Sequence, residues 1–249
     1  MTMTNQTYNL WLWANWPVPR HVRAGISLRK GGVSLPPFDE LNLGLHVGDD
    51  VKNVLNNRDI LSQHLSLTSD PVWLDQLHST NIIMVDNHTI GASADGSYTV
   101  EKNTACTVIT ADCVPILFCN AEGTKIAAIH AGWKGISSGI VEKAIRLFSK
   151  PNTIYVWIGP CISSDNYEVG KGMYDQCRNQ KSILKTAFTK KNEDHWYCDL
   201  TKMVKTILYR TGVHQIYECG LCTYRMNKLF YSYRREGVTG RQASMIWME

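Results

Sequence analysis

Apolar and β-branched residues occur along the chain in short runs separated by glycine, proline and polar residues, a pattern typical of β-strands joined by turns. The predicted strands are 22–28, 80–85, 106–110, 116–119, 125–129, 153–158, 215–219, 229–233 and 243–247. Because strands dominate and helices are interspersed among them, the pattern predicts a mixed α/β fold.

Three other segments space their apolar side chains at helical intervals. The predicted helices are 51–67, 135–148 and 200–208. Asp49 and Asp50 precede the first helix and Asp199 the third, and aspartate is a favoured N-cap because its carboxylate accepts a hydrogen bond from a first-turn N–H. No repeat, linker or low-complexity tract interrupts the series, so we expect residues 1–249 to form one domain.

Composition narrows the classes of function. The chain has 249 residues, of which 44% are apolar, and a net charge of +4. This small basic excess is spread along the chain, so it argues against nucleic-acid binding and suits a small anionic substrate. No apolar run approaches the ~20 residues that a membrane-spanning helix requires, and we therefore expect no membrane partner.

The cysteines and the N-terminal segment indicate a cytoplasmic protein. Eight cysteines are too few for a disulfide scaffold in a chain of this length, so we expect reduced thiols or metal ligands. The segment 1–19 contains Trp11, Trp13 and Trp16, but it lacks the basic start and continuous apolar core of a signal peptide.

One thiol and two imidazoles stand at strand ends or in loops, where side chains are both fixed and accessible. They are His78 after Gln76-Leu77, Cys113 after Ala111-Asp112, and His130 before Ala131-Gly132. Two His and one Cys fill three positions of a tetrahedral zinc site and leave the fourth for water or substrate. Each residue taken alone is more simply a core side chain, but the three together predict a catalytic metal site. Asp112 either orients a ligand or moves protons, or it is a structural carboxylate.

Other motifs favour structural roles. Cys219-Gly220-Leu221-Cys222 has no second pair with which to form a closed zinc site, and Cys161 has no histidine partner in sequence, so we interpret these cysteines as packing thiols. Tyr233-Arg234-Arg235 and Gly240-Arg241 are typical of a solvated strand edge.

Candidates for an anion site lie elsewhere. Arg29-Lys30-Gly31-Gly32 resembles an anion cradle, although a solvated hairpin turn is equally consistent with it. Arg29, Asn42 and Lys134 are the residues that we expect to bind phosphate or substrate. Copper oxidation is disfavoured, because multicopper sites are rich in histidine and this chain has eight His and no H-x-H pair.

Six motifs in one order resemble the YfiH family over about residues 22–247. They are 42–49 (NLGLHVGD), 76–78 (QLH), 111–115 (ADCVP), 130–135 (HAGWKG), 158–162 (IGPCI) and 231–235 (YSYRR). Members of this family are described as laccase-domain or polyphenol oxidase proteins and as purine nucleoside phosphorylases. The chain departs from the family at Gly96, where an alanine is common, and at Lys134, where an arginine is frequent.

The resemblance implies both a fold and an activity. The fold is a layered α/β domain similar to the cysteine hydrolase domain of cytotoxic necrotizing factors, with zinc bound by His78, Cys113 and His130. The activity is phosphorolysis of adenosine, inosine, guanosine and methylthioadenosine, together with deamination of adenosine. The resemblance leaves open whether the protein is a monomer or a homodimer.

Two other functions remain open. One is a cysteine-type amidase or hydrolase that acts on a peptidoglycan precursor, as some relatives edit peptidoglycan, with Cys113 as nucleophile and His130 as base. The other is a non-catalytic zinc-binding protein. The presence of bound metal distinguishes the cysteine hydrolase from a zinc enzyme, because a thiolate that binds zinc is not free to attack a substrate.

Overall fold

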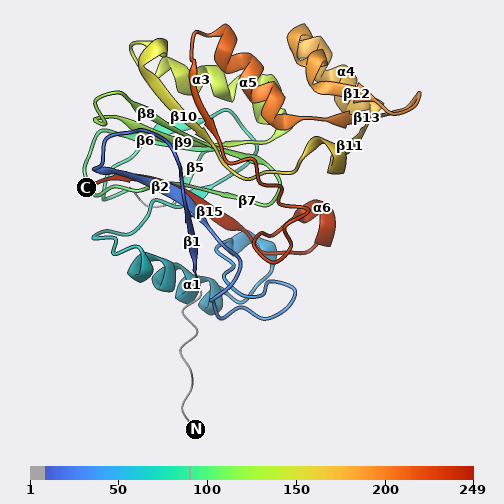
Figure 1. The fold of residues 1–249 in the computed structure, drawn as a ribbon. Coiled ribbons are helices and arrows are strands. Elements are labelled where there is room, and N and C mark those ends of the chain that lie inside the picture. Colours follow the sequence, from blue (N-terminus) through green and yellow to red (C-terminus); the bar gives the residue numbers. More distant parts are fainter. Residues whose placement is uncertain (1–8, 90) are drawn as a thin grey trace.

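The computed structural model describes residues 9–89 and 91–249, and two β-sheets form its centre (Figure 1). The four-stranded sheet is antiparallel throughout and has the order β1 (Trp11–Trp13), β2 (Val22–Ser27), β15 (Gln242–Met248), β7 (Cys106–Thr110). The six-stranded sheet has the order β14 (Gln215–Glu218), β10 (Ile154–Ile158), β8 (Val114–Asn120), β9 (Ile126–Ala131), β6 (Gly96–Thr99), β4 (Ile82–Met84). Its central pairs are antiparallel and its two edge pairs are parallel, so the predicted mixed α/β fold is confirmed.

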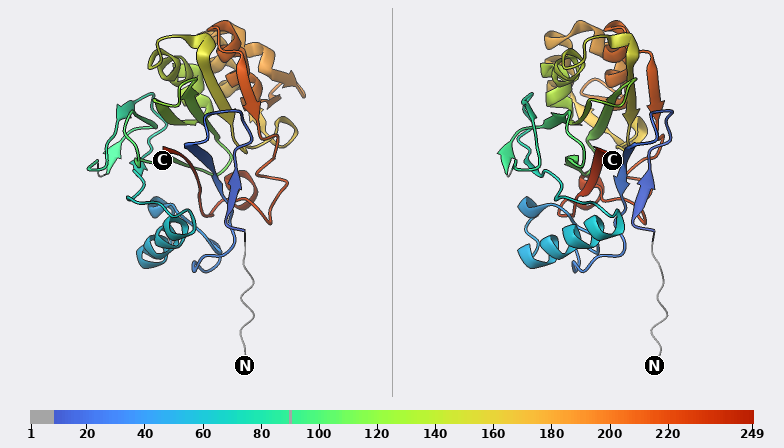
Figure 2. Two further views of the ribbon diagram at one scale, coloured as in Figure 1. Left: turned by 60° about the vertical axis from the view of Figure 1, so that its left-hand side comes forward. Right: turned by 90° about the vertical axis from the view of Figure 1, so that its left-hand side faces the viewer.

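The two sheets pack face to face and helices cover their outer faces, which gives four layers (Figures 1 and 2). Successive strand residues point to opposite faces, and β8 shows the consequence. Its Leu117 and Cys119 join the core between the sheets, whereas Ile116 and Phe118 join the core beneath the helices. A strand buried on both faces is apolar throughout, which explains why the sequence predicted β8 and its neighbours well.

The helices are α1 (Val51–His64), α2 (Trp133–Ser138), α3 (Ile140–Arg146), α4 (Lys171–Gln180), α5 (Leu200–Arg210) and α6 (Tyr233–Glu236). Helix α1 covers the four-stranded sheet, and α2, α3 and α5 cover the six-stranded sheet. Two of the predicted N-caps are confirmed: Asp50 accepts the N–H of Lys52, and Asp199 accepts the N–H of Lys202. None of the helices in the described ranges is both long and apolar enough to cross a membrane.

Two small sheets lie at the edges of the layers. One has the order β11 (Glu168–Gly170), β13 (His195–Cys198), β12 (Phe188–Lys190) and lies beside α4; the other pairs β3 (Leu74–Asp75) with β5 (Ala92–Ser93). Helix α4 and the three-stranded sheet were not predicted.

The predicted helix 135–148 is wrong as a single element. Gly139 has a φ of 102°, and its N–H bonds back to the carbonyls of Gly135 and Ile136, so α2 ends there and α3 begins. Only glycine adopts this left-handed conformation at little cost. The helix also begins two residues earlier than predicted, at Trp133.

The predicted strand 229–233 is also wrong. The side chain of Gln242 binds both backbone groups of Tyr231, accepting its N–H at 2.9 Å and donating to its carbonyl at 3.3 Å. These bonds replace a strand neighbour, and the segment leads into α6 at Tyr233.

The Trp-rich segment had no assigned element, and residues 11–13 of it form the edge strand β1. Trp11 and Trp13 pack against Trp247 of β15, with ring centroids 6.3 and 6.0 Å from that of Trp247. Residues 1–8 of the segment lie outside the described part of the chain.

Candidate metal centre

The three predicted ligands come together, although they belong to three separate segments. Cys113 lies in the turn between β7 and β8, His130 lies on β9, and His78 lies in the loop between β3 and β4. Their ligand atoms all lie within 4.8 Å of one another. The imidazole rings of His78 and His130 meet edge to face, with centroids 4.7 Å apart. Within the described residues this is the one cluster of His, Cys, Asp or Glu able to hold a metal ion.

A buried carboxylate, Asp95, fixes both histidines. Its Oδ1 lies 2.8 Å from Nδ1 of His130 and accepts the backbone N–H of His78 at 3.0 Å. Its Oδ2 accepts the backbone N–H groups of Leu77 and Ser79. The bond to Nδ1 orients the His130 ring and leaves Nε2 free as a ligand, a common arrangement around bound metals. The backbone bonds hold His78 at a φ of 56°, a conformation that non-glycine residues rarely adopt.

The sequence did not predict this role for Asp95; in the motif Ala94-Asp95-Gly96 it singled out only Gly96, as a departure from the family. The same motif explains why glycine replaces the family's alanine. A Cβ at Gly96 would lie 2.7 Å from Cγ2 of Ile129 on the neighbouring strand, so the bulk of Ile129 excludes a side chain here.

The thiol and the imidazoles shift one another's pKa. Burial raises the pKa of Cys113, but the charge of the His130 ring and hydrogen bonds from His130 and His78 outweigh it and bring the pKa to about 6. Burial lowers the pKa of His130, but the Cys113 thiolate and the Asp95 carboxylate raise it to about 9. A thiolate therefore faces an imidazolium at neutral pH. The thiolate is the form of cysteine that binds metals, and His130 would give up its Nε2 proton when a metal binds.

The donor set and the space around it fit a metal ion. Two imidazoles and one thiolate suit zinc, and three protein ligands leave one coordination position open. Gly132 keeps the space clear, because a Cβ there would lie 3.0 Å from Sγ of Cys113 and 3.1 Å from Cδ2 of His78. His130 is buried whereas His78 is exposed, so the cluster opens to solvent on the side of His78.

Asp112 ties the Cys113 turn to two distant loops. Its Oδ1 accepts the hydroxyl of Thr223 at 2.6 Å, and its Oδ2 accepts the N–H of Arg234 at 2.7 Å. Its carbonyl accepts the N–H of Ile162 at 3.0 Å. Because both carboxylate oxygens already accept hydrogen bonds, the geometry favours a positioning role for Asp112 over proton transfer.

The predicted anion cradle at Arg29 has no free guanidinium. The Arg29 side chain is 9% exposed, and its Nη1 pairs with Glu236 at 2.8 Å while its Nη2 lies 3.6 Å from Asp39. Lys30 pairs with Glu40 at 2.7 Å. The turn is thus an ion-paired structural element.

Asn42 and Lys134 have different surroundings. Asn42 is buried, and its amide binds Asp49, Gly44 and the backbone of Arg241, so it holds loops together. Lys134 is exposed in the first turn of α2, beside the segment that carries His130. Of the three predicted phosphate-binding residues, Lys134 alone presents its charge to solvent.

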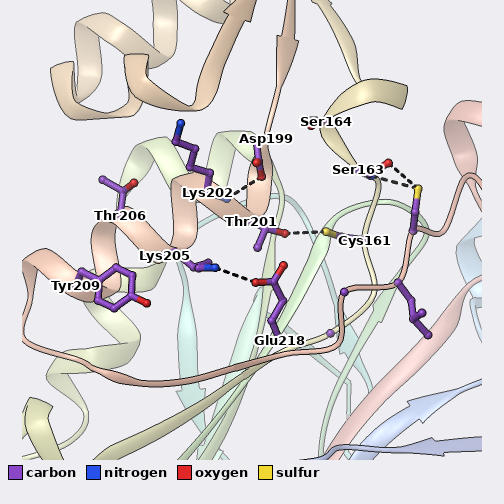
Figure 3. A pocket seen from close by; sticks show the side chains of 14 residues that line it. Cys161, Ser163, Ser164, Asp199, Thr201, Lys202, Lys205, Thr206, Tyr209 and Glu218 are labelled. Atoms are coloured by element: carbon purple, nitrogen blue, oxygen red, sulfur yellow. Dashed lines mark hydrogen bonds and ion pairs between the residues drawn. The ribbon is translucent and has the colours of Figure 1, made fainter.

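Two of the predicted packing thiols, Cys161 and Cys222, line a separate cavity of about 450 Å³ (Figure 3). Cys161 lies 3.3 Å from the hydroxyl of Thr201, and burial raises the pKa of its thiol to about 12. Cys222 accepts a hydrogen bond from the hydroxyl of Ser163 at 3.0 Å. All eight cysteines of the chain are free thiols.

A second cavity has a volume of about 550 Å³, and none of the three predicted metal ligands is among its lining residues. Trp73, Arg58, Leu45, Ile109 and Asp75 are among its lining residues. The Arg58 guanidinium covers the Trp73 ring at 3.9 Å from its centroid. His46 also lines the cavity and was not predicted to take part in the site.

Comparisons with known proteins find relatives over nearly the whole chain. A family model described as "Multi-copper polyphenol oxidoreductase laccase" matches residues 23–249. Purine nucleoside phosphorylase YfiH of Escherichia coli is 41% identical over 235 residues, which cover 94% of this chain and 96% of that protein. A purine nucleoside phosphorylase of Haemophilus influenzae is 38% identical over 238 residues, covering 94% of this chain and 98% of that protein.

Solved structures also match over nearly the whole chain. YlmD from Geobacillus stearothermophilus superposes with a TM-score of 0.90 at 31% identity, covering 98% of each chain. A Bacillus licheniformis protein named YfiH superposes with a TM-score of 0.85 at 33% identity, covering 92% of this chain and 93% of that one. The chain therefore belongs to the YfiH family, a group of laccase-domain proteins with relatives named purine nucleoside phosphorylases.

Proposed function

We propose that this protein is a zinc-dependent purine nucleoside phosphorylase that also deaminates adenosine. The observation that carries the proposal is the cluster of His78, Cys113 and His130, three ligands with one open side. The names of the curated relatives support the reaction class. The proposed substrates are adenosine, inosine, guanosine and methylthioadenosine, and phosphate is the second substrate.

The chain's own residues prepare the site. His78, Cys113 and His130 hold the metal, and Asp95 fixes the orientation of His130 through Nδ1. Asp112 holds the turn that carries Cys113. When bound, zinc supplies Lewis-acid chemistry, polarising an oxygen or acidifying a water molecule.

Zinc fits better than a set of copper ions. Oxidation by a multicopper enzyme requires several histidine-rich sites that pass electrons between them. The described residues provide one cluster, in which the third ligand is a thiolate.

The cavity beside His46 is the proposed nucleoside site. Its volume of about 550 Å³ lies within the ~300–1,000 Å³ typical of small-molecule pockets. Apolar Leu45 and Ile109 and the aromatic Trp73 provide surfaces for a flat purine ring.

The principal alternative is a cysteine hydrolase. The lowered pKa of Cys113 and the neighbouring His130 are what a thiol nucleophile and its base require. If the metal-free protein, and not the zinc-loaded protein, cleaves an amide of a peptidoglycan precursor, this alternative replaces the phosphorylase. A non-catalytic zinc protein is the remaining alternative, and the open side of the cluster argues against it. We also propose a cytoplasmic location, where free thiols stay reduced.

A product assay tests the proposal. Zinc-loaded protein is incubated with adenosine or inosine, with and without phosphate, and the products are separated by chromatography. We expect free purine and ribose 1-phosphate only when phosphate is present, and inosine from adenosine in either case. Equal release of purine without phosphate, with free ribose as the other product, would replace phosphorolysis with hydrolysis.

A further inference from the structure

Arg241 is a half-buried arginine with no carboxylate partner in the described part of the chain. Its Nη1 donates to the carbonyls of Thr239 and Gly240, both at 2.9 Å. Across residues 9–89 and 91–249 no Asp or Glu oxygen lies within 4.0 Å of this guanidinium, whereas Arg29 and Arg235 both pair with Glu236. Burial lowers the pKa of Arg241. A partly desolvated cation without a counter-charge is suited to bind an anionic ligand.

Residues 42–44, which lead into the segment that contains His46, fix the Arg241 backbone and lie against its side chain. The N–H of Arg241 donates to Oδ1 of Asn42 at 2.9 Å, and its carbonyl accepts the N–H of Leu43 at 3.1 Å. The side chain then crosses Gly44 so closely that a Cβ there would lie 2.8 Å from Cγ of Arg241. Gly44 itself has an ordinary extended conformation, with a φ of −93°, so its lack of a side chain serves the passage of Arg241.

The same guanidinium lies on the side of the metal centre that carries Cys113. It is 5.9 Å from the ring of Tyr233, the first residue of α6, and the next residue, Arg234, donates its N–H to Asp112. The negative charges of Cys113 and Asp112 act to raise the pKa of Arg241. Arg241 therefore stands within electrostatic range of the cluster.

His46 links this arginine to the cavity proposed for the nucleoside. Burial lowers the pKa of His46, and the charges of Arg241 and His130 lower it further. The His46 ring lines the cavity and is close enough to Arg241 and His130 for the charges of both to act on it. A neutral imidazole in this place is able to donate one hydrogen bond to an oxygen.

We propose that Arg241, held across Gly44 beside His46, binds the phosphate co-substrate between the metal cluster and the nucleoside cavity. This inference rests on the proposed function and assigns its phosphate subsite to residues that the sequence had placed at a solvated strand edge. Arginine binds phosphate through two parallel N–H···O bonds, and Nε and Nη2 of Arg241 make no hydrogen bond within the described residues.

Phosphate bound there attacks the ribose. One phosphate oxygen forms a bond to C1′ as the bond from C1′ to N9 of the purine breaks. The electron pair of the broken bond goes to the purine, which takes up the proton released by phosphate. Free purine and ribose 1-phosphate are then the only products, and no oxidant or reductant is required.

The test compares Arg241→Gln with Arg210→Gln, which removes the same charge from the exposed last turn of α5. Zinc content, KM for phosphate, KM for inosine and the shift in Tm caused by inorganic phosphate at constant ionic strength are measured for each variant. A charge-assisted hydrogen bond contributes about 1.5–3 kcal/mol, so we expect Arg241→Gln to raise KM for phosphate at least about tenfold. Its zinc content and KM for inosine should match those of the control, and the phosphate-induced shift in Tm should disappear.

A second variant moves the arginine and keeps its charge. Gly44→Ala places a methyl group against Cγ of Arg241 and should raise KM for phosphate in the same direction. If Arg241→Gln does not fold, this variant decides the question. An unchanged KM for phosphate in the variant that folds overturns the inference and leaves the phosphorylase intact; Lys134→Gln then tests the remaining exposed cation.

The shift in Tm caused by phosphate tests the proposed phosphate site separately from the proposed phosphorylase activity. If the wild-type protein cleaves no nucleoside but phosphate raises its Tm, and Arg241→Gln loses that rise, the proposed function fails and the anion site stands. If phosphate neither raises the wild-type Tm nor supports cleavage, both are refuted.

Discussion

Replacing Asp95 tests how the metal centre is built. Its buried carboxylate, 0% exposed, accepts the ring N–H of His130 and the backbone N–H groups of Leu77, His78 and Ser79. One side chain therefore orients one metal ligand and fixes the backbone of another. If this description is right, Asp95 controls metal affinity without touching the metal.

The expected magnitudes follow from these bonds. In Asp95→Ala the donors of His130 and His78 lose their acceptor, and each unsatisfied buried donor costs about 1–3 kcal/mol. We therefore expect the metal-free protein to lose roughly 2–5 kcal/mol of unfolding free energy. Asp95→Asn keeps the volume and one acceptor oxygen, but its NH₂ group cannot accept from a backbone N–H. Loss of such an outer partner typically weakens metal binding about 10–100-fold, and we expect Asp95→Asn to fall in this range.

Two measurements check the prediction. Competition with a chelator gives the zinc dissociation constant, and urea unfolding of the chelator-treated protein gives the stability. Asp59→Asn makes the same chemical change on the exposed face of α1 and is the matched control. If Asp95→Asn binds zinc within twofold of wild type, the carboxylate does not position the ligands and our account of the site is wrong.

Four further outcomes are expected. Cys113→Ser should lose zinc and phosphorolysis yet unfold cooperatively, because a hydroxyl is a poor zinc ligand of nearly the same size; zinc analysis and circular dichroism check this. Cys161→Ser should keep full activity, because burial raises the pKa of that thiol to about 12 and keeps it protonated; the product assay checks it. Gly139→Ala should lower stability in urea by about 1–2 kcal/mol, since alanine is strained at a φ of 102°. Burial raises the pKa of Glu236, but hydrogen bonds, including that from Arg29, hold the pKa below 4.5. The stability that ionised Glu236 provides is therefore present above pH 4.5 and lost as the pH falls below it. Glu236→Gln should flatten this part of a curve of unfolding free energy against pH.

The sequence predicted the elements whose apolar pattern is local and strong. Strands β8 and β9 are buried on both faces and read as continuous apolar runs. Strand β1 has only three residues and acquires its place through packing against Trp247, more than 200 positions away in the chain. A residue that is distant in sequence also explains the wrong strand at 229–233. The side-chain amide of Gln242 makes the backbone hydrogen bonds that a neighbouring strand would have made.

The sequence singled out the three residues that cluster in the structure, but not the side chain that supports them. His78, Cys113 and His130 have side chains whose chemistry is unusual enough to be noticed at strand ends. Asp95 is an ordinary acidic residue until folding brings it to Nδ1 of His130, 35 positions later. Arg29 is a similar case: a cation beside two glycines suggested an anion site, but its ion-pair partner, Glu236, lies 207 positions further along the chain.

The way the proposed ligands are anchored determines what a bound metal would do for the protein. His130 belongs to β9, Cys113 directly precedes β8, and the two strands pair with each other at the centre of the six-stranded sheet. Cores on both faces of that sheet fix these strands without any contribution from a metal. Small zinc modules differ, because metal binding supplies their folding free energy. Here the packing of the sheet and the hydrogen bonds to Asp95 hold the two imidazoles and the thiolate together. If the proposed ion binds, its binding energy is then not needed to fold the chain, and a fourth coordination position would stay open for substrate because stability does not require a fourth protein ligand.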